Sequence, residues 1–165
     1  MAAERKSVND WTSLPFIVIT SAGFIAAGLD FVVLQNLQFQ VFTFIGLVSL
    51  AIWGYVRFKA RLELKEKAKF ESLAATGKLA TMKNHQLVTD GLYQHIRHPI
   101  YLGETLRNLG IVTLLSSICG VLFIVVATSL LLFRIGIEEK LLIEVFSEDY
   151  KEYQQTTKKL IPHIY

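Results

Sequence analysis

The chain has 165 residues, of which 52% are hydrophobic, and 17 Lys and Arg against 14 Asp and Glu give a formal net charge of +3. This length provides room for one domain, and the single cysteine, Cys119, excludes a disulfide within these residues. The apolar residues are gathered into long runs, which is typical of helices that cross a bilayer and not of a soluble core. The composition therefore predicts an all-α integral membrane protein.

The first two apolar runs are each long enough to span a membrane. Leu14–Leu34 contains one charged residue, Asp30, and Phe39–Val56 contains none. A bilayer core needs about 20 apolar residues per helix, so we expect one transmembrane helix from each run. No small-residue cleavage site follows a short apolar core in this region, so we expect the first run to be a retained span and not a signal peptide.

A charged helix is expected to continue out of the second span. Arg57–Ala75 is rich in Ala, Glu, Lys and Leu. Glu63 and Lys67, and Lys67 and Glu71, have the i,i+4 spacing that stabilises a helix surface. Gly77 is expected to end this helix.

The third apolar stretch is too long for one span. Ile100–Phe133 would be about 50 Å long as a continuous helix, against a hydrocarbon core of roughly 30 Å. Ser116–Gly120 offers a turn near its middle, which predicts an antiparallel hairpin of Ile100–Ser117 and Gly120–Ile137. Glu138–Lys159 is then expected to form a separate cytoplasmic helix.

The distribution of Lys and Arg supports four spans. Two lie before the first span, nine lie between Arg57 and Arg97, one is Arg107, and five lie from Arg134 onward. Because cytoplasmic loops are enriched in Lys and Arg, this pattern predicts a multi-pass protein with both termini and the Arg57–Pro99 loop in the cytoplasm. The basic segments favour an anionic lipid surface over nucleic acid as a partner. We expect residues 1–76 (two spans and a juxtamembrane helix) and 77–165 to form a single domain.

A polar motif stands at the start of the third span. Arg97-His98-Pro99-Ile100-Tyr101 places a cation, an imidazole and a phenol where backbone N–H groups are unsatisfied and the helix dipole favours an anion. A carboxylate or a phosphate could bind there. The alternative is a snorkelling Arg97 with interfacial aromatic residues, which many spans carry.

The fourth span ends on the carboxylates Glu138 and Glu139, with Arg134 one turn before Glu138. These residues could form an i,i+4 ion pair at the membrane border, which contributes only tenths of a kcal/mol when exposed. Alternatively, a carboxylate holds the ammonium group of a ligand while Arg134 orients an anionic partner.

Charged and amide side chains also lie inside the third span. Glu104, Arg107 and Asn108 are one to two turns into it, where charges are costly unless paired or facing a wet cavity. They could form a Glu104–Arg107 pair facing the bundle, or line a site for a substrate head group. Asp30 raises the same question without an obvious partner. No dinucleotide-binding, Walker-type or zinc-spaced motif is present.

Taken in order, these motifs resemble the isoprenylcysteine carboxyl methyltransferase family and the broader group of small membrane methyltransferases that includes phospholipid N-methyltransferases. The resemblance covers residues 78–163. It is carried by His85-Gln86-Leu87-Val88-Thr89-x-Gly91-Leu92-Tyr93, Arg97-His98-Pro99-Ile100-Tyr101-Leu102-Gly103, Gly110, Ile118-Cys119-Gly120, Arg134-x-x-x-Glu138-Glu139-x-x-Leu142, Phe146-x-x-x-Tyr150-x-x-Tyr153 and Leu160-Ile161-Pro162.

The resemblance implies S-adenosylmethionine as methyl donor, held at the cytoplasmic end of the hairpin. Glu138 would bind its ammonium group and Arg134 would lie beside the methyl acceptor. The residues implied to enclose the donor are His85, Gln86, Leu87, Val88, Tyr93, His98, Pro99, Ile100 and Tyr101.

The acceptor implied by the resemblance is lipophilic, either an isoprenylcysteine-type carboxylate or a phospholipid amine. An amine would need a base, for which Glu104 is a candidate, so the catalytic candidates are Arg134 and Glu104. Arg134, Arg107 and Asn108 are the candidates for binding the acceptor. A nicotinamide-dependent reductase and a non-enzymatic membrane scaffold are the alternatives from other classes.

Overall fold

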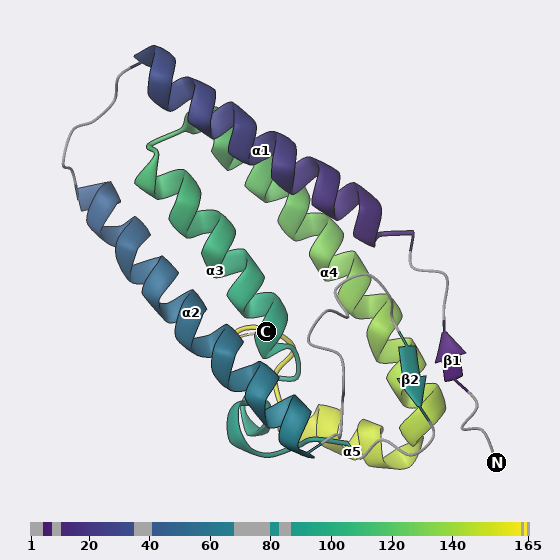
Figure 1. Cartoon of the computed structure of the whole chain (residues 1–165). Coiled ribbons are helices and arrows are strands. Elements are labelled where there is room, and N and C mark those ends of the chain that lie inside the picture. The colour runs from purple at the N-terminus through teal and green to yellow at the C-terminus, as the bar shows by residue number, and fades with distance from the viewer. Residues whose placement is uncertain are drawn as a thin grey trace.

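Four long helices run side by side in the computed structural model, which describes residues 5–7, 11–34, 41–67, 80–82, 87–162 and 164 (Figure 1). They are α1 (Ser13–Leu34), α2 (Val41–Lys67), α3 (Pro99–Leu114) and α4 (Ile118–Phe146). A 3-10 turn, η1 (Gly91–Gln94), precedes α3, and α5 (Glu148–Thr156) follows α4. The predicted helical fold is confirmed, with one small addition. Strands β1 (Arg5–Ser7) and β2 (Ala80–Met82) pair antiparallel, with Lys6 opposite Thr81.

The helices stand close to the predicted positions. Among the described residues, α1 and α4 are long and apolar enough to cross a membrane. Helix α2 continues past the second apolar run, as predicted, as far as Lys67, and the rest of that predicted helix lies outside the described residues. Large apolar side chains on the outer faces of α1 and α4 are exposed, including Leu29 and Leu122. Such faces are suited to lipid.

The predicted hairpin turn is confirmed. Helix α3 ends at Leu114, Ser116 has a φ of 50°, and α4 begins at Ile118. The hydroxyl of Ser117 caps α4 by accepting a hydrogen bond from the backbone N–H of Gly120 at 2.9 Å. The same hydroxyl lies 2.6 Å from Asp30 Oδ2, so the charged residue of α1 has a partner at this end of the bundle.

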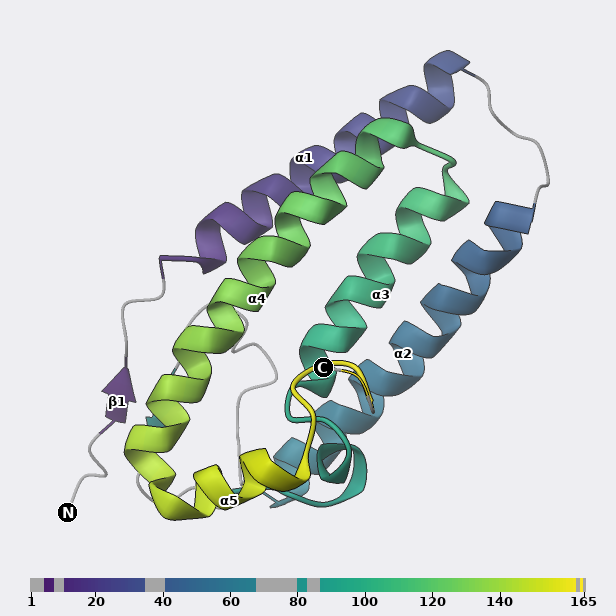
Figure 2. The same cartoon turned by 180° about the vertical axis from the view of Figure 1, so that it is seen from behind.

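The predicted break between the fourth span and the C-terminal helix is wrong. Helix α4 runs without interruption through Glu138 to Phe146, and the chain turns at Ser147, which has a φ of 52°. The polar pair at Glu138 and Glu139 does not end the helix because Glu139 is buried among cationic side chains and needs no exit to water. Helix α5 then turns across the end of the bundle (Figure 2).

The contact between α2 and α3 depends on two glycines. A Cβ atom on Gly46 would lie 2.8 Å from the backbone nitrogen of Leu114 and 2.9 Å from the carbonyl oxygen of Gly110. The hydroxyl of Ser49 donates to the carbonyl oxygen of Leu106 at 3.0 Å across the same interface. Small residues let membrane helices approach closely, and here they bring the backbones of α2 and α3 into contact.

The two ends of the bundle differ in character. The C-terminal end of α1, the N-terminal end of α2 and the α3–α4 turn lie together at one end (Figures 1 and 2). The C-terminal end of α2, η1 and α5 lie at the other end. Most of the Lys and Arg residues in the described part of the chain lie in the C-terminal half of α2, directly before α3, or from Arg134 onward, so they gather toward the second end.

Gly91 allows η1 to lie against α2. It has a φ of +66°, and a Cβ atom there would overlap the carboxylate of Glu63. The other oxygen of Glu63 accepts a hydrogen bond from the backbone N–H of Leu92 at 2.9 Å. The position therefore requires glycine both for its backbone conformation and for the space beside the carboxylate.

We expect Gly91→Ala to lower the free energy of unfolding by about 2 kcal/mol, because it forces a left-handed conformation on alanine and displaces Glu63. The Tm of the detergent-purified protein measures this change. Gly54→Ala is the control, since a Cβ at Gly54 meets nothing within 4 Å. Equal Tm values for the two variants would contradict this account of η1.

Candidate functional site

The loop before α3 is held by the C-terminal segment of the chain. The backbone N–H of Arg97 donates to the carbonyl of Lys158 at 2.8 Å, and the N–H of His98 donates to the carbonyl of Lys159 at 3.2 Å. In return, the N–H of Lys158 donates to the carbonyl of His95 at 3.2 Å. Residues 95–98 and 157–160 thus form a short parallel contact that positions the start of α3.

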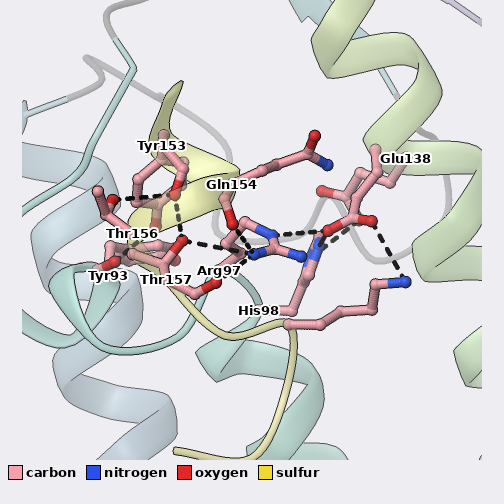
Figure 3. Close-up of polar contacts among 10 residues, drawn as sticks. Tyr93, Arg97, His98, Glu138, Tyr153, Gln154, Thr156 and Thr157 are labelled. Atoms are coloured by element: carbon pink, nitrogen blue, oxygen red, sulfur yellow. Dashed lines mark hydrogen bonds and ion pairs between the residues drawn. The ribbon is translucent and has the colours of Figure 1, made fainter. Parts of the chain in front are cut away.

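The Arg97 side chain joins three parts of the chain. Its Nε donates to Glu139 Oε1 on α4 at 2.7 Å, and its Nη1 donates to the carbonyl oxygens of Gln154 and Thr157 at 3.2 and 2.5 Å (Figure 3). This side chain is only 8% exposed. The snorkelling interpretation of Arg97 is therefore wrong, because the guanidinium points into the protein and satisfies backbone carbonyls there.

Glu139 is enclosed by cationic and imidazole nitrogens. Besides Arg97, His98 Nε2 lies 3.4 Å from Oε1, and Lys159 Nζ lies 3.4 Å from Oε2. A buried carboxylate with several such partners is a structural element that is costly to disrupt. Of the two carboxylates that the sequence singles out, Glu139 therefore links α4 to the loop before α3 and to the C-terminal segment.

Glu138 lies in a group of four polar side chains contributed by α4 and the start of α3. Its Oε2 is buried and has no hydrogen-bond partner within the described part of the chain, the nearest imidazole nitrogen, His98 Nδ1, being 3.9 Å away. The ring of His98 stacks on Tyr101 with centroids 5.7 Å apart. Arg134 Nε donates to the Tyr101 hydroxyl at 3.0 Å. The structure thus brings together His98, Tyr101, Arg134 and Glu138, as the sequence predicts.

Tyr93 forms an apolar wall beside this group. It packs with Val88 and Ala60 in a buried cluster against which Ile100 is also packed. Its hydroxyl lies 3.5 Å from the carbonyl of Ala60, and its own carbonyl accepts from Tyr153 at 2.5 Å (Figure 3). Burial, together with the neighbouring Glu138 carboxylate, raises the pKa of Tyr93 far above its ordinary value, so this hydroxyl stays neutral.

The remaining residues predicted to enclose a ligand are placed as follows. Pro99 is fully buried at the first position of α3, and Leu87 is half-buried directly before Val88. His85 and Gln86 lie outside the described residues.

The charges inside α3 form a second polar group. Glu104 Oε2 lies 2.7 Å from Arg107 Nη1, so the pair expected from the sequence is confirmed. Arg107 also donates to Asn108 Oδ1, from Nη2 at 3.0 Å. The guanidinium of Arg57 on α2 contacts the same Glu104 carboxylate. Each oxygen of Glu104 therefore faces a guanidinium group and not a space that a substrate could enter, which does not favour Glu104 as a base.

Several residues that build the site carry no local signal in the sequence. Arg57 and Glu63 read as surface charges of a juxtamembrane helix, yet both are engaged with groups more than 25 positions away. Thr157 contributes its carbonyl oxygen to the contact with the Arg97 guanidinium described above. Among these residues, only Arg57 has a position in the sequence, at the end of an apolar run, that could have indicated its role in the site.

A family model and two relatives of known name match this chain. The model of the isoprenylcysteine carboxyl methyltransferase (ICMT) family matches residues 69–144. A protein-S-isoprenylcysteine O-methyltransferase from Schizosaccharomyces pombe is 32% identical over 132 residues, which are 79% of this chain and 54% of that protein. A protein of the same name from Saccharomyces cerevisiae is 42% identical over 82 residues, 49% of this chain and 34% of that protein.

A solved structure of the eukaryotic intramembrane Ras methyltransferase ICMT has a TM-score of 0.72 and 24% identity, covering 95% of this chain and 55% of that one. The helical bundle therefore has the same fold as the matched part of that structure. The predicted resemblance to the isoprenylcysteine carboxyl methyltransferase family is confirmed over residues 69–144. The chain spans about half the length of the Schizosaccharomyces pombe relative and less of the other.

We expect Arg97→Ala to lower the free energy of unfolding by about 3–5 kcal/mol, because it leaves the buried Glu139 without its main partner. Lys151→Ala is the matched control, since the 2.7 Å pair of Lys151 with Glu148 is exposed and contributes roughly 0–1 kcal/mol. Thermal unfolding of the two variants in detergent measures the difference. A stability of Arg97→Ala close to that of Lys151→Ala would show that Arg97 does not hold the segment in place.

Proposed function

We propose that this protein transfers a methyl group from S-adenosylmethionine to the carboxylate of an isoprenylcysteine-type acceptor at the membrane surface. The observation that carries the proposal is the buried carboxylate oxygen of Glu138, which has no hydrogen-bond partner among the described residues and lies 3.9 Å from His98 Nδ1. The family match covers both residues. An acidic oxygen in such a position is suited to an ammonium group. The names of the relatives support the acceptor class.

The residues present fit S-adenosylmethionine. The donor supplies a methyl group bound to a positively charged sulfur. Glu138 would hold its ammonium group, and the wall formed by Leu87, Val88, Tyr93 and His98–Tyr101 would exclude water from it. His85 and Gln86 complete the set by resemblance.

Arg134 is the residue that we assign to the acceptor. Its guanidinium is buried and contacts the Tyr101 hydroxyl, which places a fixed cation one helical turn from Glu138. A carboxylate is ionised at neutral pH, so methylation needs orientation and not a base. An amine acceptor would need a base, and the two guanidinium groups around Glu104 do not favour that role.

We propose four spans, α1 to α4, with the site and both termini on the cytoplasmic side. The gathering of basic segments at one end of the bundle supports this topology. Trp11, whose ring lies 5.5 Å from that of Phe133, supports a membrane boundary near the level of Arg134, because tryptophan is enriched at such boundaries.

A protease-cleavable tag at either end of the chain should be cut only from the cytoplasmic side of sealed vesicles. Both tags are informative, because an even number of spans returns the chain to the side on which it started. A tag cut only from the opposite side would require a different number or orientation of spans.

We expect Glu138→Gln to weaken S-adenosylmethionine binding at least tenfold, because the neutral amide loses the charge that attracts the ammonium group. Isothermal calorimetry on purified protein gives the affinity. Glu152→Gln, at an exposed position on α5, is the control and should bind as the unmodified protein does.

Arg134→Ala separates the two halves of the proposed site in the same measurements. It should retain donor binding within a few fold and slow methyl transfer to S-farnesylcysteine by at least 100-fold. Loss of donor binding in Arg134→Ala would place this residue on the donor side. Unchanged affinity in Glu138→Gln would remove Glu138 from the site.

A further inference from the structure

The polar group between α2 and α3 carries more positive than negative charge. Arg57 and Arg107 share the single carboxylate of Glu104, which leaves a formal charge of +1. The three side chains are 17%, 24% and 7% exposed, respectively, so little water reaches them. Uncompensated charge in such surroundings is costly, and an anion beside the two guanidinium groups would offset that cost.

One hydrogen-bond donor in the same place lacks an acceptor within the described part of the chain, whereas the carboxylate of Glu104 is in contact with both guanidinium groups. The indole Nε1 of Trp53 is buried and has no partner among the described residues. Trp53 and Arg57 both pack against Gly103, where a Cβ would lie 3.6 Å from Trp53 Cδ1 and 3.5 Å from Arg57 Cβ. An orphaned indole N–H next to a guanidinium indicates a missing acceptor.

The surroundings of this group point to a ligand carried by a lipid. On α2, Ile52, Tyr55 and Phe58 are 45%, 62% and 72% exposed, so the helix that contributes Trp53 and Arg57 presents apolar side chains outward at the same level. Arg107 also lies over the ring of Phe24, with its guanidinium carbon 5.8 Å from the ring centroid. A soluble anion would have to cross this apolar surface, whereas the head group of a lipid would reach it from the bilayer.

We propose that Trp53, Arg57 and Arg107 form a binding site for the anionic head group of a lipid, separate from the group around Glu138. The ligand is a phosphate or a carboxylate attached to acyl or prenyl chains, and the charged guanidinium groups and the indole N–H supply its hydrogen bonds. Glu104 keeps the two arginines in place. The site requires no methyl transfer, so it can be tested whether or not the proposed activity is present.

The fluorescence of Trp53 can be used to detect a ligand bound at this site. The chain has two tryptophans, and Trp11→Phe leaves Trp53 as the only one. The purified variant would be placed in micelles doped with phosphatidylglycerol or phosphatidylcholine carrying brominated acyl chains, which quench indole fluorescence on contact. We expect half-maximal quenching at a several-fold lower mole fraction of phosphatidylglycerol than of phosphatidylcholine.

Variants in this background identify the groups responsible. Arg107→Gln should abolish the preference for phosphatidylglycerol, and Arg107→Lys should retain part of it. Lys59→Gln is the control, because it removes one positive charge from α2 at a residue that contacts Tyr55 and not Glu104. It should leave the preference unchanged.

Adding S-farnesylcysteine distinguishes the two sources of the anion. If it restores the fluorescence, the site also accepts the carboxylate of a prenylated acceptor. If brominated phosphatidylglycerol stays bound, the site holds a phospholipid, and either result supports an anion site for lipids. Equal quenching by the two phospholipids in the Trp11→Phe protein would overturn the proposal, as would a preference that Lys59→Gln removes and Arg107→Gln does not.

Discussion

The contact between Arg97 and Glu139 is the interaction on which the polar end of the molecule depends. It links the loop before α3 to α4, and the same guanidinium satisfies two carbonyl oxygens at the end of α5. Because a buried ion pair is strongly destabilised when one partner is lost, each of these elements holds the others in place. His98 and Tyr101, directly after Arg97, are thereby brought to Glu138 and Arg134.

The two neighbouring glutamates show how context divides one sequence feature into two roles. Glu139 has cationic or imidazole partners on both of its oxygens, whereas one oxygen of Glu138 is buried without a hydrogen-bond partner in the described part of the chain. On a helix, adjacent residues point in directions about 100° apart, so one faces the interior contacts and the other faces the group around Tyr101. The ammonium group of a ligand would neutralise Glu138 as Arg97 neutralises Glu139.

Much of the fold could be predicted because apolar run length and charge distribution depend on local composition. The positions of α1 to α4 and the α3–α4 turn follow from such runs, and the motif around His98 and Glu138 could be located before the structure was known. The continuation of α4 to Phe146 could not, since it depends on Glu139 meeting Arg97 from 42 positions earlier. The contact of Arg57 with Glu104 could not be predicted for the same reason, because Arg57 comes from another helix.

The most direct test of the account is methyl transfer by the unmodified protein, reconstituted in lipid with S-adenosylmethionine labelled in its methyl group. S-farnesylcysteine and phosphatidylethanolamine would be offered in parallel. We expect label in S-farnesylcysteine that alkali releases as methanol, because a methyl ester is base-labile and an N-methyl group is not. Alkali-stable label in the phospholipid, or no label in either acceptor from well-folded protein that binds the donor, would contradict it.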